Sequence, residues 1–250
     1  ENLAGLLIPR MNESRIIVAL DYSDSQQALN LVNRLDKTHC RIKVGKELFT
    51  AAGPQFIEQL ISRGFEVFLD LKFHDIPNTV AQACKVAASL GVWMINVHAS
   101  GGKKMLLAAR DALPPGKTKL IAVTVLTSLD QQALNEIGWY RTPIDITKQL
   151  ASLASDCGLD GVVCSAAEAP LIRKSISQKN FWLVTPGIRP ADSAQDDQAR
   201  VTTPRTAILN GADYLVIGRP ITQSADPIAT LQQLNQEITS AYSEKQLAAG

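Results

Sequence analysis

The sequence has no hydrophobic run long enough to span a membrane. No apolar segment approaches the roughly 20 residues that a transmembrane helix needs. The first residues also lack the basic, apolar and small-residue zones of a signal peptide. These absences predict a soluble, cytoplasmic protein that does not bind membranes.

Cysteine and histidine are scarce and scattered. The four cysteines contain no Cys-x-x-Cys pair and lie in apolar surroundings: Cys40, Cys84, Cys157 and Cys164. This usage is typical of reduced, mostly buried thiols. The three histidines show no metal-ligand spacing: His39, His74 and His98. The sequence therefore gives no reason to expect a structural zinc site.

The chain also has no excess of either charge. Lys and Arg total 25 against 24 Asp and Glu, which gives a formal net charge of +1. Such a balance provides no general attraction to nucleic acid or to an anionic membrane. Any anionic ligand must therefore be held by local groups.

The length of 250 residues and a hydrophobic fraction of 46% suit one large α/β domain as well as two small ones, and one domain is our first expectation. Short β-branched runs alternate with segments of helical period, as in a parallel α/β fold. The predicted strands are 15–21, 41–45, 66–72, 94–99, 120–126, 161–165, 182–187 and 214–218. The predicted helices are 25–35, 54–63, 78–90, 102–112, 144–157, 166–176, 204–210 and 221–241.

Eight such pairs predict a single-domain TIM (β/α)₈ barrel. We expect the barrel to span residues 14–242, with an N-terminal extension at 1–13 and a disordered tail at 243–250. An open doubly wound sheet is the alternative. No Gly-x-Gly-x-x-Gly follows the first strand, so dinucleotide binding is not expected.

The barrel hypothesis predicts that polar residues cluster where strands end, because catalysis in this fold occurs at the carboxyl ends of the strands. The strongest cluster is Asp70, Lys72 and Asp75, directly after an apolar run. Residues two apart on a strand share a face, so Asp70 and Lys72 are expected to point the same way. Burying two charged side chains costs free energy unless the charges form an ion pair or take part in the chemistry of the protein. The alternative interpretation is a purely structural ion pair.

The last two strand ends predict a phosphate site. Glycines there let backbone N–H groups approach phosphate oxygens, and Gly218, Arg219 and Arg189 lie at these ends. The polar stretch from Arg189 to Thr202 is long for a loop and is interpreted as a lid. The alternatives are surface arginines and a merely flexible loop.

The run at 70–79 closely resembles the signature of the orotidine 5'-phosphate decarboxylase family. It reads Asp70, Leu71, Lys72, Phe73, His74, Asp75, Ile76, Pro77, Asn78 and Thr79. Similar blocks follow the family order at 18–21, 43–45, 126–128, 185–189, 198 and 217–221. Asp-x-Lys-x-x-Asp alone also occurs in metal-assisted sugar-phosphate barrels, so the other blocks make the resemblance specific.

The resemblance implies decarboxylation of orotidine 5'-phosphate to uridine 5'-phosphate without a metal or organic cofactor. It implies that Lys72 protonates C6 within a catalytic set of Lys43, Asp70, Lys72 and Asp75. The whole 70–79 run is expected to contribute to substrate binding.

The resemblance also assigns binding roles. Asp21 and Lys43 would contact the ribose, and Thr127 and Ser128 would contact the pyrimidine. The phosphate would be held by Gln198, Gly218 and Arg219, with Arg189 assisting. A homodimer is expected, in which Asp75 and Thr79 reach the active site of the partner subunit.

Purely structural roles are the alternative for several of these residues. Asp21 could cap the helix that starts near Ser25, and Thr127 or Ser128 could cap the next helix. His74 and His98 are interpreted as structural rather than catalytic. The rival functions are a magnesium-assisted sugar-phosphate enzyme and a barrel that binds a nucleotide without catalysis.

Overall fold

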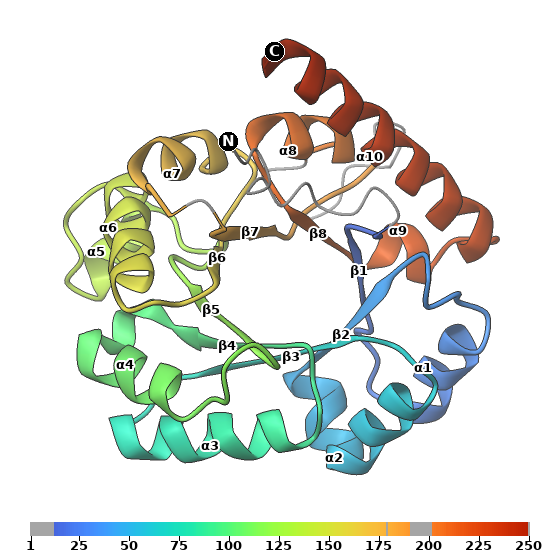
Figure 1. Cartoon of the computed structure of the whole chain (residues 1–250), viewed down its shortest axis with the longest axis horizontal. Coiled ribbons are helices and arrows are strands. Elements are labelled where there is room, and N and C mark those ends of the chain that lie inside the picture. The colour runs from blue at the N-terminus through green and yellow to red at the C-terminus, as the bar shows by residue number, and fades with distance from the viewer. Residues whose placement is uncertain (1–12, 179, 191–201, 250) are drawn as a thin grey trace, which may run out of the picture.

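A computed structural model describes residues 13–178, 180–190 and 202–249, and over these residues eight parallel strands close into a barrel (Figure 1). The strands are β1 Ile16–Ala19, β2 Arg41–Gly45, β3 Val67–Phe73, β4 Met94–His98, β5 Lys119–Val123, β6 Gly161–Val163, β7 Trp182–Thr185 and β8 Tyr214–Ile217. Each strand pairs with its neighbours in sequence, and β8 pairs with β1. The predicted TIM barrel is confirmed.

Helices surround the barrel (Figure 1). They are α1 Ser25–Val32, α2 Lys46–Ser62, α3 Pro77–Ser89, α4 Lys103–Asp111, α5 Gln131–Glu136, α6 Pro143–Asp156, α7 Ala169–Ser175, α8 Pro204–Asn210, α9 Arg219–Thr222 and α10 Pro227–Ala249, with a 3₁₀ turn η1 at Ala99–Gly101. In the part of the chain that the structure describes, no helix has both the length and the apolar character to cross a membrane.

The core has two layers because consecutive strand residues point to opposite faces. One cluster inside the barrel contains Ile17, Phe68, Met94, Ile121, Val184 and Tyr214. The residues next to them, such as Ile16, Leu69 and Leu120, belong to the larger cluster between barrel and helices. The four cysteines are free and buried, as predicted. Burial raises the pKa of Cys40 and of Cys84 to about 12.

Several predicted boundaries were wrong at the carboxyl ends of strands. Strand β5 ends at Val123 and β7 at Thr185, rather than at Leu126 and Gly187. The residues that follow leave the sheet to line the mouth of the barrel. Periodicity did not detect the end of β5 because Val125 and Leu126, which follow Thr124, are apolar, and Val125 is buried in a separate small cluster with Leu134.

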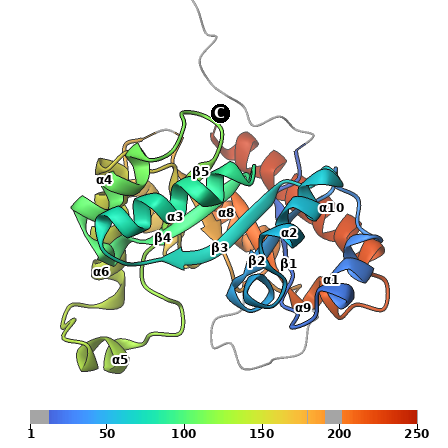
Figure 2. The same ribbon diagram turned by 90° about the horizontal axis from the view of Figure 1, so that it is seen from below.

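That small cluster supports α5, a helix the sequence pattern did not predict. Leu134 of α5 packs against Val125 and against Ile146 of α6. Asp130 caps the start of α5 by accepting a hydrogen bond from the backbone N–H of Ala133. Figure 2 shows α5 and α9 toward the lower edge of the molecule. Helix α9 follows directly after β8. With only six residues, α5 is too short to show a clear helical period.

Two other predicted helices differ. The segment predicted as one helix at 221–241 is divided into α9 and α10, and α10 continues to Ala249, where a disordered tail was expected. Helix α2 begins at Lys46, eight residues before the predicted start, and is kinked at Gly53. Gly53 has φ 69°, a conformation that glycine adopts without the steric cost of a side chain.

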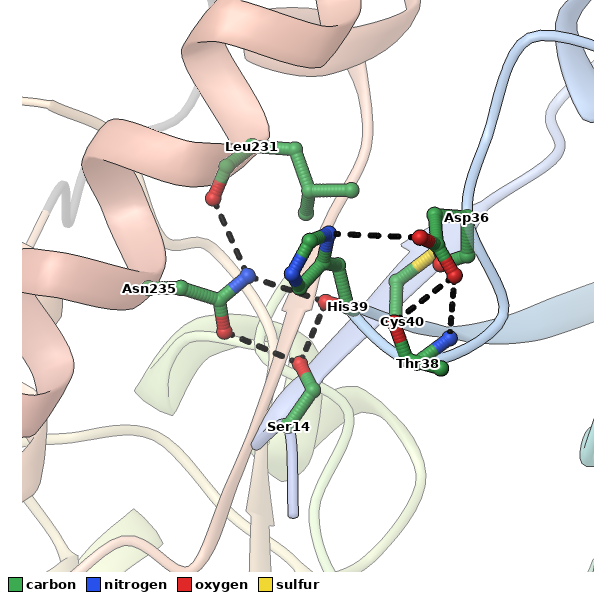
Figure 3. Close-up of polar contacts among 7 residues, drawn as sticks. All are labelled: Ser14, Asp36, Thr38, His39, Cys40, Leu231 and Asn235. Atoms are coloured by element: carbon green, nitrogen blue, oxygen red, sulfur yellow. Dashed lines mark hydrogen bonds and ion pairs between the residues drawn. The ribbon is translucent and has the colours of Figure 1, made fainter. Parts of the chain in front are cut away.

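The amino ends of the strands are joined to the last helix by a polar cluster (Figure 3). The hydroxyl of Ser14 lies 2.5 Å from the carbonyl oxygen of His39 and 3.0 Å from Oδ1 of Asn235. Asn235 Nδ2 donates to the same His39 carbonyl at 2.9 Å. One amide on α10 therefore fixes the starts of β1 and β2, at the end of the barrel opposite the strand ends that carry the candidate site.

Candidate active site

A cavity of about 290 Å³ opens at the carboxyl ends of the strands. Its apolar floor includes Ala19, Phe68, Val123 and Val184. The structure brings eight of the predicted site residues to its wall: Asp21, Lys43, Asp70, Lys72, Thr127, Arg189, Gly218 and Arg219. These residues come from strand ends and loops that span the sequence from β1 to β8, so the closed barrel is what assembles the site.

An array of alternating charges crosses one side of the cavity. Asp70 Oδ1 lies 2.7 Å from the Lys72 ammonium, and Asp70 Oδ2 lies 3.2 Å from the Lys43 ammonium. Lys43 also lies 3.5 Å from Asp21, whose side chain is 68% exposed. Asp70 is thus the buried centre of the array, and each of its oxygens has a cationic neighbour.

The charge state of Asp70 follows from these neighbours. Burial alone would raise the pKa of Asp70, but Lys43 and Lys72 oppose it, and hydrogen bonds from Lys72 and Asn96 add to their effect. The result is a pKa below the ordinary carboxyl value. Asp70 is therefore an anion at neutral pH and can only accept hydrogen bonds.

Lys72 has an unusual backbone. With φ 51° it is the one non-glycine residue with positive φ in the described part of the chain. This conformation costs a residue with a side chain about 1 kcal/mol or more. Asp70 and Lys72 do point the same way, as predicted, because their side chains form an ion pair. The predicted reason, a regular strand, was wrong. The register of β3 against β4 shifts between Leu69 and Phe73.

Asn96 on β4 is a site residue that sequence reasoning missed. It is 1% exposed, its Oδ1 accepts from the Lys72 backbone N–H at 2.8 Å, and its Nδ2 donates to Asp70 Oδ1 at 2.7 Å. The available signal was a single amide between apolar neighbours in the run Met94–His98. Buried amides need partners, so that position indicated a polar contact inside the protein.

The rest of the 70–79 run is not in this cavity. Leu71 and Phe73 pack against the core beneath the helices. Pro77 is the first residue of α3. The remaining predicted residues are exposed: His74, Asp75, Ile76, Asn78 and Thr79. Asp75 Oδ1 accepts a hydrogen bond from the Ile76 backbone at 2.6 Å.

The two histidines lie beside the array. The ring centroids of His74 and His98 are 5.5 Å apart. Burial lowers the pKa of His98, and His74, Lys46 and Lys72 lower it further. His98 is therefore neutral at pH 7.

The capping alternatives for three site residues were wrong. Asp24, not Asp21, caps α1 by accepting from the backbone of Gln26. Asp130 caps α5 in place of Thr127 or Ser128. Asp21, Thr127 and Ser128 are exposed at the mouth of the barrel, and Ser128 is outside the cavity wall. Helix capping therefore does not account for these polar residues.

The opposite side of the cavity is formed by the ends of β7 and β8. Gly187 has φ 74°, which turns the chain sharply after β7. Arg189 follows it, is 7% exposed, and donates its backbone N–H to Thr202 at 3.0 Å. Gly218 and the exposed Arg219 complete this side. Gln198 lies outside the described residues.

The fold and the site together define a class: a (β/α)₈-barrel protein whose mouth holds a lysine–carboxylate array on one side and glycine–arginine turns on the other. The sequence profile described as the Orotidine 5'-phosphate decarboxylase / HUMPS family matches residues 14–234. The chain belongs to this family.

Individual relatives are similar over almost their whole length. The chain is 64% identical over 231 residues to orotidine 5'-phosphate decarboxylase of Nitrosomonas eutropha, covering 92% of this chain and 100% of the relative. Identity to that of Nitrosospira multiformis is 63% over 228 residues, covering 91% and 95%. A crystal structure of orotidine 5'-phosphate decarboxylase from Lactobacillus acidophilus superposes with a TM-score of 0.81 at 39% identity, covering 90% of this chain and 99% of that one.

Proposed function

We propose that this protein decarboxylates orotidine 5'-phosphate to uridine 5'-phosphate in the cytoplasm, as a step of pyrimidine synthesis. The observation that carries the proposal is the Lys43–Asp70–Lys72 array beside a cavity whose other side has two arginines. The names of relatives more than 60% identical over most of the chain support the same substrate.

The reaction demands what this array can supply. When the bond from C6 to the carboxylate breaks, its electron pair stays on C6 and neutral CO₂ leaves. The resulting carbanion lies in the plane of the ring, where the π-system cannot delocalise it. Nearby positive charge and a ready proton must stabilise it. In our proposal the Lys72 ammonium gives a proton to C6, and the neutral amine later regains one from water.

Asp70 would lie near the substrate carboxylate. Two anions repel in the bound substrate, and the repulsion disappears as neutral CO₂ forms. Asp70 also holds two ammonium groups in place before the substrate arrives, so little reorganisation is needed as negative charge develops at C6. No step in this scheme needs a metal or an organic cofactor.

The remaining side chains would bind the parts of the nucleotide that do not react. In our proposal Asp21 and Lys43 contact the ribose hydroxyls, and Thr127 and Ser128 contact the pyrimidine edge. The phosphate would bind Gln198, Gly218 and Arg219, with Arg189 assisting, since guanidinium groups match phosphate oxygens in bidentate fashion.

The other residues of the 70–79 run would act across a homodimer interface. Asp75 and Thr79 are exposed, which leaves them available to reach the cavity of a partner subunit. Ile76 and Val86, next to and on α3, are 69% and 63% exposed, and apolar side chains at such levels support a protein contact on this face.

The test is to mix the purified protein with orotidine 5'-phosphate in excess chelator and to follow loss of the orotate absorbance. Metal-independent conversion to uridine 5'-phosphate is the expected result. Activity that appears only with a sugar phosphate and Mg²⁺ would assign the chain to the metal-assisted barrels. Tight binding of the nucleotide without turnover would indicate a binding protein.

A further inference from the structure

A local distortion separates β3 from β4 at the catalytic pair. Leu69 pairs with Ile95 and Phe73 pairs with Val97, so three residues of β3 lie opposite the single residue Asn96. The extra residues cannot all take part in the parallel ladder. The backbone therefore loops out where Asp70 and Lys72 are located, and Lys72 adopts its positive φ there.

The side chain of Asn96 fills the place of the missing ladder bonds. Its Oδ1 accepts from the backbone N–H of Lys72 at 2.8 Å, and its Nδ2 donates to Asp70 Oδ1 at 2.7 Å. A backbone N–H can only donate and an ionised carboxylate can only accept, so the amide fits in one orientation. Few side chains of this length offer an acceptor and a donor together. Aspartate lacks the donor and leucine has neither.

The Asp70 oxygen that Asn96 contacts is also the one that binds the Lys72 ammonium at 2.7 Å. The amide thus fixes both ends of one small ring: the backbone from which the Lys72 side chain starts and the carboxylate on which its ammonium rests. With Asn96 1% exposed, water cannot readily replace it.

We infer that Asn96 is the positioning residue of the site, which sets the Asp70 carboxylate and the Lys72 backbone so that the ammonium stands at one defined point. This inference rests on the proposed decarboxylation. Asn96 acts through Asp70 and Lys72, and it is absent from the cavity wall.

The experiment compares Asn96→Ala and Asn96→Asp with the wild type and with Thr118→Val. Thr118 is a matched control, because it is 3% exposed and its hydroxyl donates to the Val92 carbonyl at 2.9 Å, just before β5 at the other end of the barrel. Both Asn96 variants should lose about 10²-fold in kcat for orotidine 5'-phosphate, since a misplacement of about 1 Å is enough for such a loss. KM should change by less than about threefold, because the phosphate contacts stay intact.

The pH profile separates positioning from general structural damage. Loss of the Asn96 donor removes a contact that favours ionised Asp70, and an aspartate at 96 adds a like charge. In the plot of kcat against pH, the acid limb of Asn96→Asp should therefore move to higher pH by about one unit or more. The limb of Thr118→Val should not move.

A measurement on the wild type does not depend on variants that fold. In protein labelled with ¹⁵N-lysine, the amide proton of Lys72 should exchange slowly with solvent, as a buried hydrogen bond requires. Fast exchange would overturn the inference, as would an Asn96→Ala enzyme with kcat and acid limb equal to those of Thr118→Val. If the wild type does not turn over orotidine 5'-phosphate, the proposed function fails. Slow exchange of the Lys72 amide proton would still support its hydrogen bond to Asn96.

Discussion

The Lys72 ammonium lies 2.7 Å from Asp70 Oδ1, at the mouth of the barrel and within the wall of the cavity. The Lys72 side chain is 28% exposed, whereas that of Asp70 is 10% exposed. The carboxylate is thus the buried anchor and the ammonium is the part that faces the open cavity. An anchored ammonium that faces the cavity is suited to deliver a proton to a bound molecule.

The first prediction concerns Lys72→Ala. We expect kcat for orotidine 5'-phosphate to fall by at least ~10²-fold, because the proposed proton donor and one cationic neighbour of Asp70 are lost together. KM should change much less, since other groups bind the phosphate. Loss of the orotate absorbance measures both constants.

The control for this variant is Lys104→Ala, an exposed lysine on α4. It should keep wild-type rates. Residual kcat within about threefold of wild type in Lys72→Ala would remove Lys72 from the mechanism.

The second prediction concerns the pH dependence of stability. The folded pKa of Asp70 is lower than its unfolded pKa, so ionised Asp70 stabilises the native state. This contribution is complete above the unfolded carboxyl pKa near 4 and is lost as pH falls through the lower folded value. The difference in unfolding free energy between wild type and Asp70→Asn should stay constant from about pH 7 to 5 and shrink below about 4.

Denaturant unfolding at a series of pH values tests this prediction. Other carboxylates titrate in both proteins and cancel in the difference. A difference that grows as the pH falls below 5 would mean that burial dominates and that the pKa of Asp70 is raised.

The sequence predicted the barrel and the charged residues that line the cavity because each depends on local pattern. Strand runs, helical periods and polar strand ends located Asp21, Lys43, Asp70 and Arg219 at one end of one barrel. The sequence did not reveal the bulge of β3, since no residue in 69–73 signals a register shift. Asn96 depends on that bulge. Its role becomes visible only when β4 lies beside the distorted strand.

The third prediction separates stability from activity at the two ends of the barrel. At the amino ends of the strands the Arg41 guanidinium lies 4.5 Å from the Trp93 ring centre and 5.0 Å from that of Tyr214. It also forms an ion pair with Glu66 at 2.8 Å. Arg41→Met keeps much of the packing but loses these interactions, so unfolding free energy should fall by about 2 kcal/mol.

The activity of Arg41→Met should remain at the wild-type level at temperatures where the protein is folded. The control is Arg34→Met at an exposed position, which should change stability by less than about 0.5 kcal/mol. A large loss of kcat in folded Arg41→Met would show that the two ends of the barrel are coupled.

The fourth prediction concerns the remote phosphate. If Arg219 binds the phosphate, its interaction energy is available only to substrates that carry one. Arg219→Ala should therefore lower kcat/KM for orotidine 5'-phosphate by about 10²-fold, the value expected for a charge-assisted bidentate contact. Orotidine without phosphate should react slowly with the wild type, and Arg219→Ala should react with it at the same rate.

Comparing orotidine 5'-phosphate with orotidine distinguishes loss of a phosphate contact from general damage to the site. Misfolding or a disturbed cavity would slow both substrates, whereas loss of a phosphate contact slows only one. Arg34→Ala should leave both rates unchanged. In the wild type, removal of the phosphate should lower kcat as well as raise KM, because the binding energy of the phosphate would be used to order the site for the chemical step. If kcat stays intact for orotidine and only KM rises, the phosphate contributes to binding alone, and the polar stretch after Arg189, which was interpreted from sequence as a lid and lies mostly outside the described residues, has no part in the chemical step.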